Sequence, residues 1–351
     1  MKSFYFVDQV ENIKSGPGIF VKNILSISNE FETDLFVLSQ DINRSKDNLI
    51  KIPSVDINNR FGTFINLFIY SLYFFIYRIR FPKSKIFINS FYQIIFSFWI
   101  GKYYLFINDL KFLERNKLII LFFKIIGKKS KLLIFNSEKS LDEVKKIIMV
   151  KHHFILHKIF LLSSKFNQKN KPKDQLVITF CKNDWKYGGL YESLDFLNEI
   201  NHNNILFRII GISDKEKYLI TKLIIKTNFR HSFEIHGILQ NQKILDYLSK
   251  SHIFLNFCRF EAFGVAAIEA ILNNNLLISL DKNNGLNQLM KKYDFGLLVS
   301  NKNDFIIKIK SFLNDKYLSK KISNDIKIIK FNFGEKKFIN NTKKLFSFNY
   351  D

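Results

Sequence analysis

The chain has 351 residues, of which 54 are lysine or arginine and 31 are aspartate or glutamate, so its formal net charge is +23. With 47% hydrophobic residues it is not a wholly disordered chain, and its length exceeds what one hydrophobic core usually holds, so we expect two domains. The two cysteines, Cys181 and Cys258, are too few for a disulfide framework and stand beside no Cys/His cluster. They indicate a reducing compartment and no structural zinc.

The positive charge is spread evenly, at +11 in residues 1–162 and +12 in residues 163–351. A pI near 9.7 is typical of nucleic-acid-binding proteins. However, no recognised nucleic-acid module is present, and the abundance of Lys, Asn, Ile and Phe fits the bias of an A/T-rich coding sequence. We therefore expect no nucleic-acid partner, while attraction to anionic lipid or to phosphorylated substrates stays open.

In the first half of the chain, short apolar runs alternate with longer mixed segments. Such runs indicate strands that are covered on both faces, and the segments between them are long enough for crossover helices. The runs are residues 3–7, 34–38, 85–89, 103–107, 131–135 and 154–156.

Residues 64–77 form the most membrane-like segment of the chain. They are shorter than the roughly 20 apolar residues that a spanning helix needs. Arg60 precedes them, and Arg78 and Arg80 follow. The segment is therefore either a buried helix of a large α/β domain or a helix that lies on a membrane surface. No secretory signal is expected, because no long apolar core precedes Asp8.

The same alternation recurs in the second half, at residues 176–181, 205–210, 232–236, 253–257, 276–280 and 296–299. Between the halves, residues 161–174 are polar, rich in Lys and Asn, and contain Pro172, as expected of a linker. The pattern predicts an α/β protein with parallel-sheet domains at 1–162 and 163–330. The remaining segment, 331–351, has weak helical periodicity.

The stretch FCRFEAFGVAAIEAILN at residues 257–273 carries the strongest functional signal. A strand leads into a loop with Glu261, and a helix is expected to begin near residues 263–264. The first amides of a helix bind a diphosphate well, and Gly264 lets a ligand approach the backbone. Glu261 is placed to accept a hydrogen bond from a sugar hydroxyl, and Glu269 is placed to accept hydrogen bonds from the hydroxyls of a ribose. Glu269 lies in an otherwise apolar run, where an unpaired carboxylate is costly, so it favours a functional role.

These residues resemble the E-x7-E motif of retaining, two-domain (GT-B) glycosyltransferases of family 4, the glycosyl transferases group 1 type. The resemblance covers nearly the whole chain. The sequence around Gly16 and Gly18 looks like the glycine-rich loop before the first helix of that family, and Ser137 fits a recurrent serine. Strand ends in the family's order match residues 209–211, 236–237, 279–281 and 284–285. The resemblance implies two facing Rossmann-like domains, with the last helix packing back on the first.

By the same resemblance, the second half holds a nucleotide-diphosphate sugar. Lys186 fits the lysine of the family's phosphate-binding pair, and Lys182 stands for its arginine, with a spacing one residue short. Glu261 and Lys186 would act on the sugar and the leaving diphosphate, and Glu269 would bind the ribose. The remaining donor-binding residues are Phe263, Gly264 and Val265 through their amides, and Gly237, Ile238 and Leu239 beside the base.

The first half departs from the family at residues 108–109. Asn108–Asp109 stands where the family often has His-Asp, and an asparagine cannot take up a proton. Asn108 is still expected to face the site, with Gly16 and Gly18 lining the acceptor or phosphate side. His152, His153 and His157 lack matching carboxylates, so no metal site is expected. No cofactor is expected either, because lysines and helix amides do what a divalent cation does elsewhere.

The resemblance implies transfer of a sugar to an acceptor hydroxyl with retention of anomeric configuration. The acceptor would be a glycan or a lipid-linked glycan of cell-surface polysaccharide or glycolipid synthesis, and the location cytoplasmic, at the inner face of the cell membrane. Three alternatives stay open: a catalytically inactive nucleotide-sugar-binding homologue, a nucleotide-sugar hydrolase or epimerase on the same scaffold, and a binder of anionic surfaces driven by charge.

Overall fold

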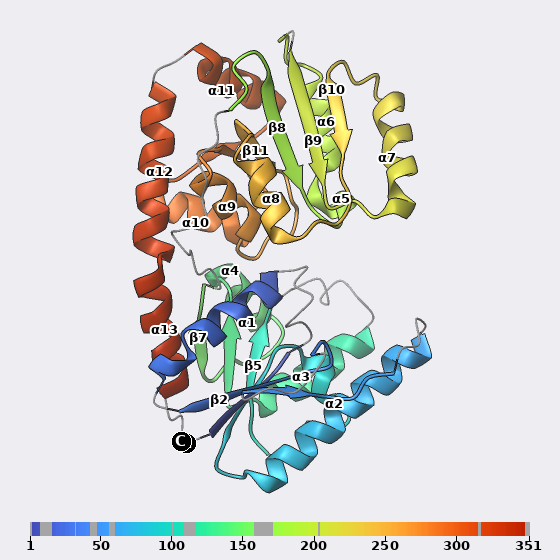
Figure 1. Ribbon diagram of the computed structural model, residues 1–351, viewed down its shortest axis with the longest axis vertical. Helices are drawn as coiled ribbons and strands as arrows, with labels where there is room; N and C mark the ends of the chain where they lie inside the picture. The colour runs from blue at the N-terminus through green and yellow to red at the C-terminus, as the bar shows by residue number, and fades with distance from the viewer. Residues whose placement is uncertain are drawn as a thin grey trace. The chain divides into compact units, whose positions relative to one another are not determined.

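The computed structural model describes residues 2–7, 16–31, 33–42, 48–55, 60–99, 101–108, 117–157, 171–202, 204–314 and 317–347. The chain divides into two compact units (Figure 1). The first unit comprises Met1–Phe160 together with Glu335–Asp351, and the second comprises Leu161–Gly334. The predicted linker at 161–174 lies mostly outside the described residues.

The first unit is built on a seven-stranded parallel sheet in the order β3-β2-β1-β4-β5-β6-β7. Six of its strands lie where the apolar runs predict them. The short β3 was not predicted, because three half-buried or exposed residues leave no apolar run. The strands are β1 (Lys2–Phe6), β2 (Asp34–Ser39), β3 (Leu49–Lys51), β4 (Lys85–Ile88), β5 (Tyr104–Ile107), β6 (Leu132–Phe135) and β7 (His153–Ile155).

Helices cover both faces of this sheet. On one face, Phe6 and Leu105 pack against α2 (Arg60–Arg80), the short helix η2 (Phe91–Ile94) and α3 (Lys117–Lys129). On the other, the sheet packs against α1 (Gly16–Ser26) and α13 (Glu335–Ser347). The C-terminal helix belongs to this core, since the ring of Phe346 lies 4.4 Å from that of Phe87 and Phe338 contacts Phe20. The remaining helices are η1 (Ser28–Glu30) and α4 (Glu138–Lys145).

The second unit contains a six-stranded parallel sheet in the order β10-β9-β8-β11-β12-β13. All six strands lie at the predicted positions. They are β8 (Leu176–Cys181), β9 (Ile205–Ile210), β10 (Ser232–Ile235), β11 (Ile253–Asn256), β12 (Leu276–Leu280) and β13 (Leu297–Val299). The helices are α5 (Trp185–Gly188), α6 (Leu190–Leu197), α7 (Asp214–Lys226), α8 (Asn241–Leu248), α9 (Val265–Leu272), α10 (Gly285–Tyr293), α11 (Lys302–Asn314) and α12 (Tyr317–Phe333).

The strand orders locate a switch point in each sheet. In the second unit the chain moves outward from β8 to β10 on one side and from β11 to β13 on the other, so the order reverses between β8 and β11. In the first unit it reverses between β1 and β4. Open α/β sheets bind ligands beyond the carboxyl ends of their strands at such points. The expected class of two Rossmann-like parallel-sheet domains is confirmed.

Helix α2 is longer than the predicted segment 64–77 and is not a buried core helix. Tyr70 and Phe74 on its inner side are buried against the sheet, whereas Phe64, Phe68 and Ile79 on its outer side are exposed. Within the described part of the chain, α2 contains the one stretch that is long and apolar enough to cross a membrane, Gly62–Arg80, with 22% of it buried.

Candidate active site

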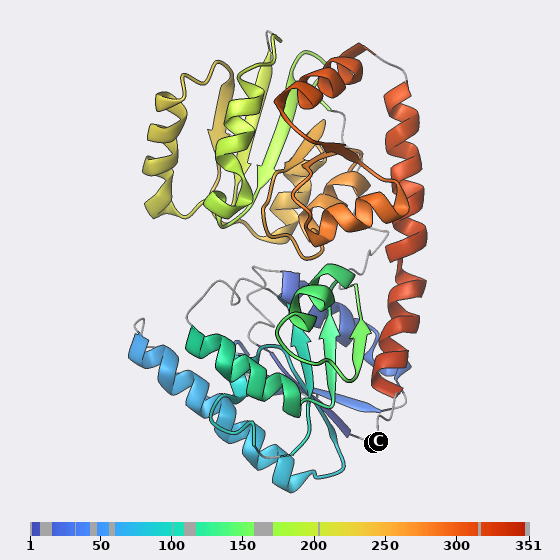
Figure 2. The same ribbon diagram turned by 180° about the vertical axis from the view of Figure 1, so that it is seen from behind.

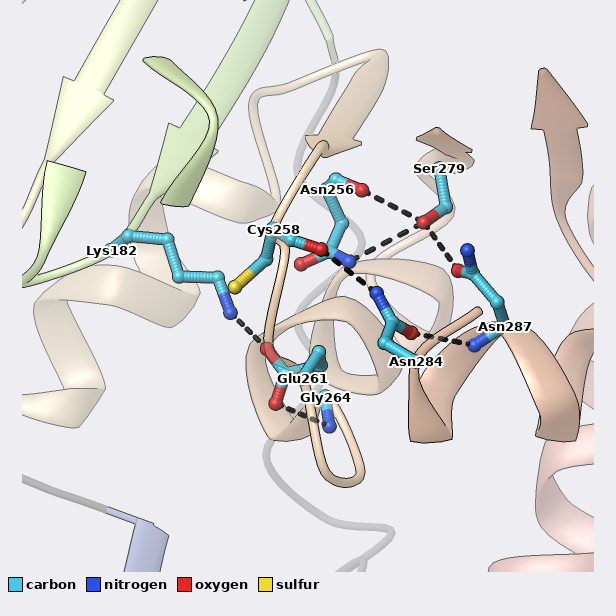
Figure 3. A network of polar contacts seen from close by, with 8 residues as sticks. All are labelled: Lys182, Asn256, Cys258, Glu261, Gly264, Ser279, Asn284 and Asn287. Atoms are coloured by element: carbon cyan, nitrogen blue, oxygen red, sulfur yellow. Dashed lines mark hydrogen bonds and ion pairs between the residues drawn. The ribbon is translucent and has the colours of Figure 1, made fainter. Parts of the chain in front are cut away.

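A lysine and a glutamate meet at the switch point of the second unit. Lys182 follows β8, Glu261 lies in the loop after β11, and the ammonium of Lys182 donates to Oε2 of Glu261 (Figure 3). Both side chains are mostly buried, at 20% and 16% exposure. Burial alone lowers the pKa of a lysine, but the adjacent Glu261 carboxylate outweighs it and holds the pKa of Lys182 above its usual value. Lys182 therefore stays protonated.

The other oxygen of Glu261 reaches the start of α9. The backbone N–H of Gly264 donates to Oε1 of Glu261 at 3.0 Å, which places a carboxylate at the positive end of the helix. Gly264 has φ +83°, and a Cβ on it would lie 2.9 Å from the side chain of Leu286. The glycine is thus required by the turn itself. Phe263 points into the core against Phe333, so only its backbone is left to the site.

Asparagines hold this loop to the start of α10. Asn284 donates to the backbone oxygen of Cys258 at 2.8 Å and accepts from the N–H of Asn287 at 2.9 Å. Asn287 in turn accepts from Ser279, whose hydroxyl lies 2.8 Å away (Figure 3). All of these side chains are buried, so the position of the loop is set by satisfied hydrogen bonds.

The predicted phosphate lysines occupy different surroundings. Lys182 is part of the network around Glu261, whereas Lys186 is exposed on α5 with its ammonium 5.4 Å from the ring centroid of Trp185. The backbone N–H of Arg259 donates to the oxygen of Tyr187 at 2.9 Å, which joins the loop after β8 to the loop after β11.

At Gly189 the same two loops approach so closely that no side chain fits. The residue has φ +82°, and a Cβ there would lie 2.3 Å from the backbone oxygen of Phe257. Glycine alone adopts this conformation without strain, so this contact explains why a glycine stands at the junction.

Glu269 lies in α9, as predicted, and is half-buried. Its Oε1 accepts from the side-chain N–H of Asn241, the first residue of α8, at 3.0 Å. Burial raises the pKa of Glu269 from 4.5 to about 7, and the Asn241 hydrogen bond only partly opposes that rise. Within the described residues no cation is paired with this carboxylate, so near neutral pH it takes up or releases a proton readily.

The segment predicted to lie beside the base follows β10 at the same edge of the sheet. The oxygen of Gly237 accepts from the N–H of Gly211 after β9 at 3.1 Å. Ile238 is exposed and Leu239 is half-buried. The carboxyl ends of β8, β9, β10 and β11 thus bring Lys182, Gly237 and Glu261 to one edge of the parallel sheet.

In the first unit, Asn108 follows β5 and joins a cluster of amides. Its Nδ2 donates to the backbone oxygen and to Oδ1 of Asn89, both at 2.8 Å, and Asn89 also accepts from the hydroxyl of Tyr5. The side chain of Asn136 donates to the oxygen of Asn108 at 3.2 Å. Among the described residues, these amides at the carboxyl ends of β4, β5 and β6 form hydrogen bonds and carry no charge.

Several predicted features of the first unit are described only in part. Gly16 and Gly18 begin α1, but their surroundings lie outside the described residues, as does Asp109. His157 contacts the backbone oxygen of Asn136 at 2.9 Å. Among the residues that the structure describes, no three His, Cys, Asp or Glu side chains gather as a bound metal ion requires.

Sequence reasoning did not find the partners of the predicted residues. Asn241 beside Glu269, Asn89 beside Asn108, and Asn287 behind the Glu261 loop all carry hydrogen bonds in the structure. Asparagine is abundant throughout this chain, so its presence at these positions gives no local signal.

Residues 163–328 match the family model of glycosyl transferases group 1. These residues contain β8 to β13 and the Lys182–Glu261 pair. The second unit is a group 1 glycosyl transferase domain. The protein is accordingly a glycosyltransferase, and the predicted family type and enzyme class are confirmed, whereas retention of configuration is not addressed by the match. No curated protein sequence matches the chain.

Solved structures share the fold of this glycosyltransferase over its whole length. Sucrose-phosphate synthase from Thermosynechococcus elongatus has a TM-score of 0.76 at 16% identity, with 99% of this chain and 98% of that chain covered. Anabaena HepE in complex with UDP and glucose has a TM-score of 0.76 at 12% identity, with 99% and 100% covered. WaaG, a glycosyltransferase of lipopolysaccharide biosynthesis, has a TM-score of 0.72 at 12% identity and the same coverage.

Proposed function

We propose that this glycosyltransferase moves a sugar from a nucleoside-diphosphate sugar to an acceptor hydroxyl with retention of anomeric configuration. The observation that carries the proposal is the meeting of Lys182 and Glu261 with the amino end of α9 at the β8/β11 switch point. A diphosphate is bound well by a cation and unpaired helix amides together. A sugar beyond that diphosphate is held by carboxylate acceptors.

Each group at this edge has a distinct task. Lys182, with Lys186 from α5, holds the diphosphate and stabilises the charge that develops on it as it leaves. Glu261 accepts hydrogen bonds from the donor sugar, and Glu269 from the ribose hydroxyls. The base lies beside 237–239. Because lysines and amides supply the positive charge, the reaction needs no metal ion.

The transfer step exchanges one bond for another at the anomeric carbon. The bond from that carbon to the diphosphate oxygen breaks, and a bond to the acceptor oxygen forms on the same face of the sugar. The acceptor proton passes to the leaving diphosphate oxygen. No protein base is required for this balance, which agrees with the presence of Asn108, rather than a titratable residue, at the end of β5.

The first unit takes the acceptor, with Asn108, Gly16 and Gly18 at the carboxyl edge of its sheet. The acceptor is a glycan or lipid-linked glycan of cell-surface polysaccharide or glycolipid synthesis, handled in the cytoplasm at the inner face of the cell membrane. The role of WaaG in lipopolysaccharide biosynthesis supports this assignment. The complex of HepE with UDP and glucose supports a nucleoside-diphosphate donor.

A thermal-shift screen over nucleoside diphosphates and their sugars tests the donor half of the proposal. One diphosphate should raise the melting temperature in proportion to the logarithm of its concentration, since only the native state binds it. Glu269→Ala should weaken its binding about 10- to 150-fold, because charge-assisted hydrogen bonds contribute about 1.5–3 kcal/mol. The matched control is Glu199→Ala, an exposed glutamate after α6, which should bind normally.

The products then decide the reaction. A retained configuration at the anomeric carbon, read by NMR on the transferred sugar, supports the proposal, and inversion overturns it. Release of free sugar without transfer indicates a hydrolase instead. Donor binding with no turnover favours a second candidate, an inactive nucleotide-sugar-binding homologue, and Asn108 in place of a titratable residue is the observation behind that candidate.

A further inference from the structure

The first unit carries an apolar stripe along the outer side of α2. Exposed apolar residues recur there every three or four positions, which places them on one side of the helix. They are Phe64, Phe68, Leu72, Ile76 and Ile79, the last with 60% of its side chain exposed. An exposed apolar stripe of this length is unusual on a monomeric soluble protein.

Helix α3 continues the apolar surface. Leu118, Leu121 and Ile125 are exposed on its outer side, and Trp99 lies on the segment that follows η2, at 56% exposure. Among the described residues of the first unit, the exposed large hydrophobic residues are Trp99, Met149 and residues of α2 and α3. We call the outer sides of α2 and α3, with Trp99, the apolar face.

The two helices form one surface because they cover the same side of the sheet. Phe74 of α2 packs on Tyr103, whose hydroxyl donates to the oxygen of Ile126 in α3 at 2.6 Å. Phe91 of η2 packs on Phe123 of α3. Both views of the molecule show α2 and α3 side by side along this side of the sheet (Figures 1 and 2).

The described elements that form the apolar face carry basic but no acidic side chains, whereas α4, which packs in the same core, carries Glu138, Asp142 and Glu143. Residues 60–108 and 117–137 contain no aspartate or glutamate. Exposed cations lie on α2 and α3 at Arg80, Lys124, Lys128 and Lys129, and Lys102 is exposed in the segment before β5. A second copy of the chain would bring the same positive charges against these, whereas an anionic surface complements them.

We propose that the apolar face docks on the surface of an anionic phospholipid bilayer. The outer side chains of α2, α3 and Trp99 insert at the level of the headgroups, and the lysines and Arg80 contact lipid phosphates. The helix does not cross the bilayer, since Tyr70 and Phe74 are buried in the sheet core and Ser71 donates to the backbone oxygen of Gln93. The inference deepens the proposed lipid-side acceptor but does not depend on donor binding.

Sedimentation with vesicles tests this docking surface on the full-length protein. Phosphatidylcholine vesicles with and without 30% phosphatidylglycerol are compared at low and high salt. The protein should bind the anionic vesicles at low salt and lose about tenfold or more in affinity at high salt. Phe68→Glu with Ile76→Glu should abolish binding, whereas the control Leu219→Glu with Ile225→Glu, two exposed apolar residues of α7, should not.

A second pair of variants isolates the charges. Replacing Lys124, Lys128 and Lys129 by glutamine should weaken vesicle binding about tenfold or more. The same change at Lys215, Lys222 and Lys226 of α7, which removes an equal charge from an exposed helix of the second unit, should have little effect. All variants are checked for a normal melting temperature and a normal thermal shift with the nucleoside diphosphate, so that failure of docking and failure of donor binding are separate results.

Three outcomes would overturn the proposal. The first is equal binding of neutral and anionic vesicles, and the second is equal loss in the α3 and α7 lysine variants. The third is a concentration-dependent dimer that Phe68→Glu with Ile76→Glu dissociates, which would assign the apolar face to a second copy of this chain.

Discussion

The carboxyl edges of the two sheets use different chemistry. In the second unit, an ion pair between Lys182 and Glu261 lies after the ends of β8 and β11, and Glu269, whose pKa is raised to about 7, lies within α9. In the first unit, the equivalent ends of β4 and β5 present the amides of Asn89 and Asn108. Charged groups bind and stabilise a leaving diphosphate, whereas neutral amides suit the hydroxyl groups of a carbohydrate. In the proposed function, the two similar folds thus serve the two substrates of one reaction.

The largest effect should come from the ion pair. Lys182→Ala removes the buried cation beside Glu261, and we expect the turnover number to fall about 10²- to 10³-fold. Lys186→Ala should cost about tenfold or less, since that lysine is exposed. Initial rates with the identified donor measure both. If Lys186→Ala lowers the turnover number more than Lys182→Ala does, the main phosphate contact lies on α5 and not at the end of β8.

The second prediction concerns pH. The pKa of Glu269 is about 7 in the native state against 4.5 when exposed, so the native state holds this proton more tightly between those values. The free energy of unfolding should therefore fall as pH rises from 4.5 to 7. Above pH 7 the contribution of Glu269 should be constant. Glu269→Gln removes the decline, a gain on the order of 2–3 kcal/mol at pH 8. Urea unfolding of both proteins at pH 5 and pH 8 measures the difference. Parallel pH profiles would contradict it.

A smaller effect is expected where asparagine supports the charged edge. Asn284→Ala removes the hydrogen bond to Cys258 and the one from the N–H of Asn287, and should cost about 1–2 kcal/mol of unfolding free energy. Because the Glu261 loop is held there, the donor KM should rise as well. A loss of stability with an unchanged KM would show that the loop keeps its place without Asn284.

The smallest effect should be at the neutral edge. Asn108→Ala removes two hydrogen bonds to Asn89 and should cost about 1 kcal/mol of stability. The acceptor KM should rise a few-fold while the thermal shift with the nucleoside diphosphate stays the same. A smaller thermal shift with the nucleoside diphosphate in this variant would contradict the assignment of the two edges to different substrates.

Much of the fold was predictable, because parallel strands buried on both faces leave apolar runs that are easily recognised. The exception was β3, whose three residues are not buried. For residues 64–77 the sequence left a buried helix and a surface helix open, because composition alone does not reveal that nothing covers the outer side of α2 within the described chain.

The site was predictable where a residue contradicted its surroundings. Glu269 stands out because a carboxylate interrupts an apolar helix. The pairing of Lys182 with Glu261 joins residues 79 positions apart, and it depends on β8 and β11 being neighbours in the sheet. Its geometry, and the partners Asn241 and Asn89, follow from tertiary contacts that have no local pattern in the sequence.

The contact at Gly189 has a practical consequence for redesign. The chain there lies directly on the backbone of Phe257, so no side chain fits at Gly189. Attempts to alter donor preference should leave the junction intact and vary the exposed Tyr187 and the half-buried Phe260 instead. Libraries that vary Gly189 itself would be expected to yield mostly misfolded protein.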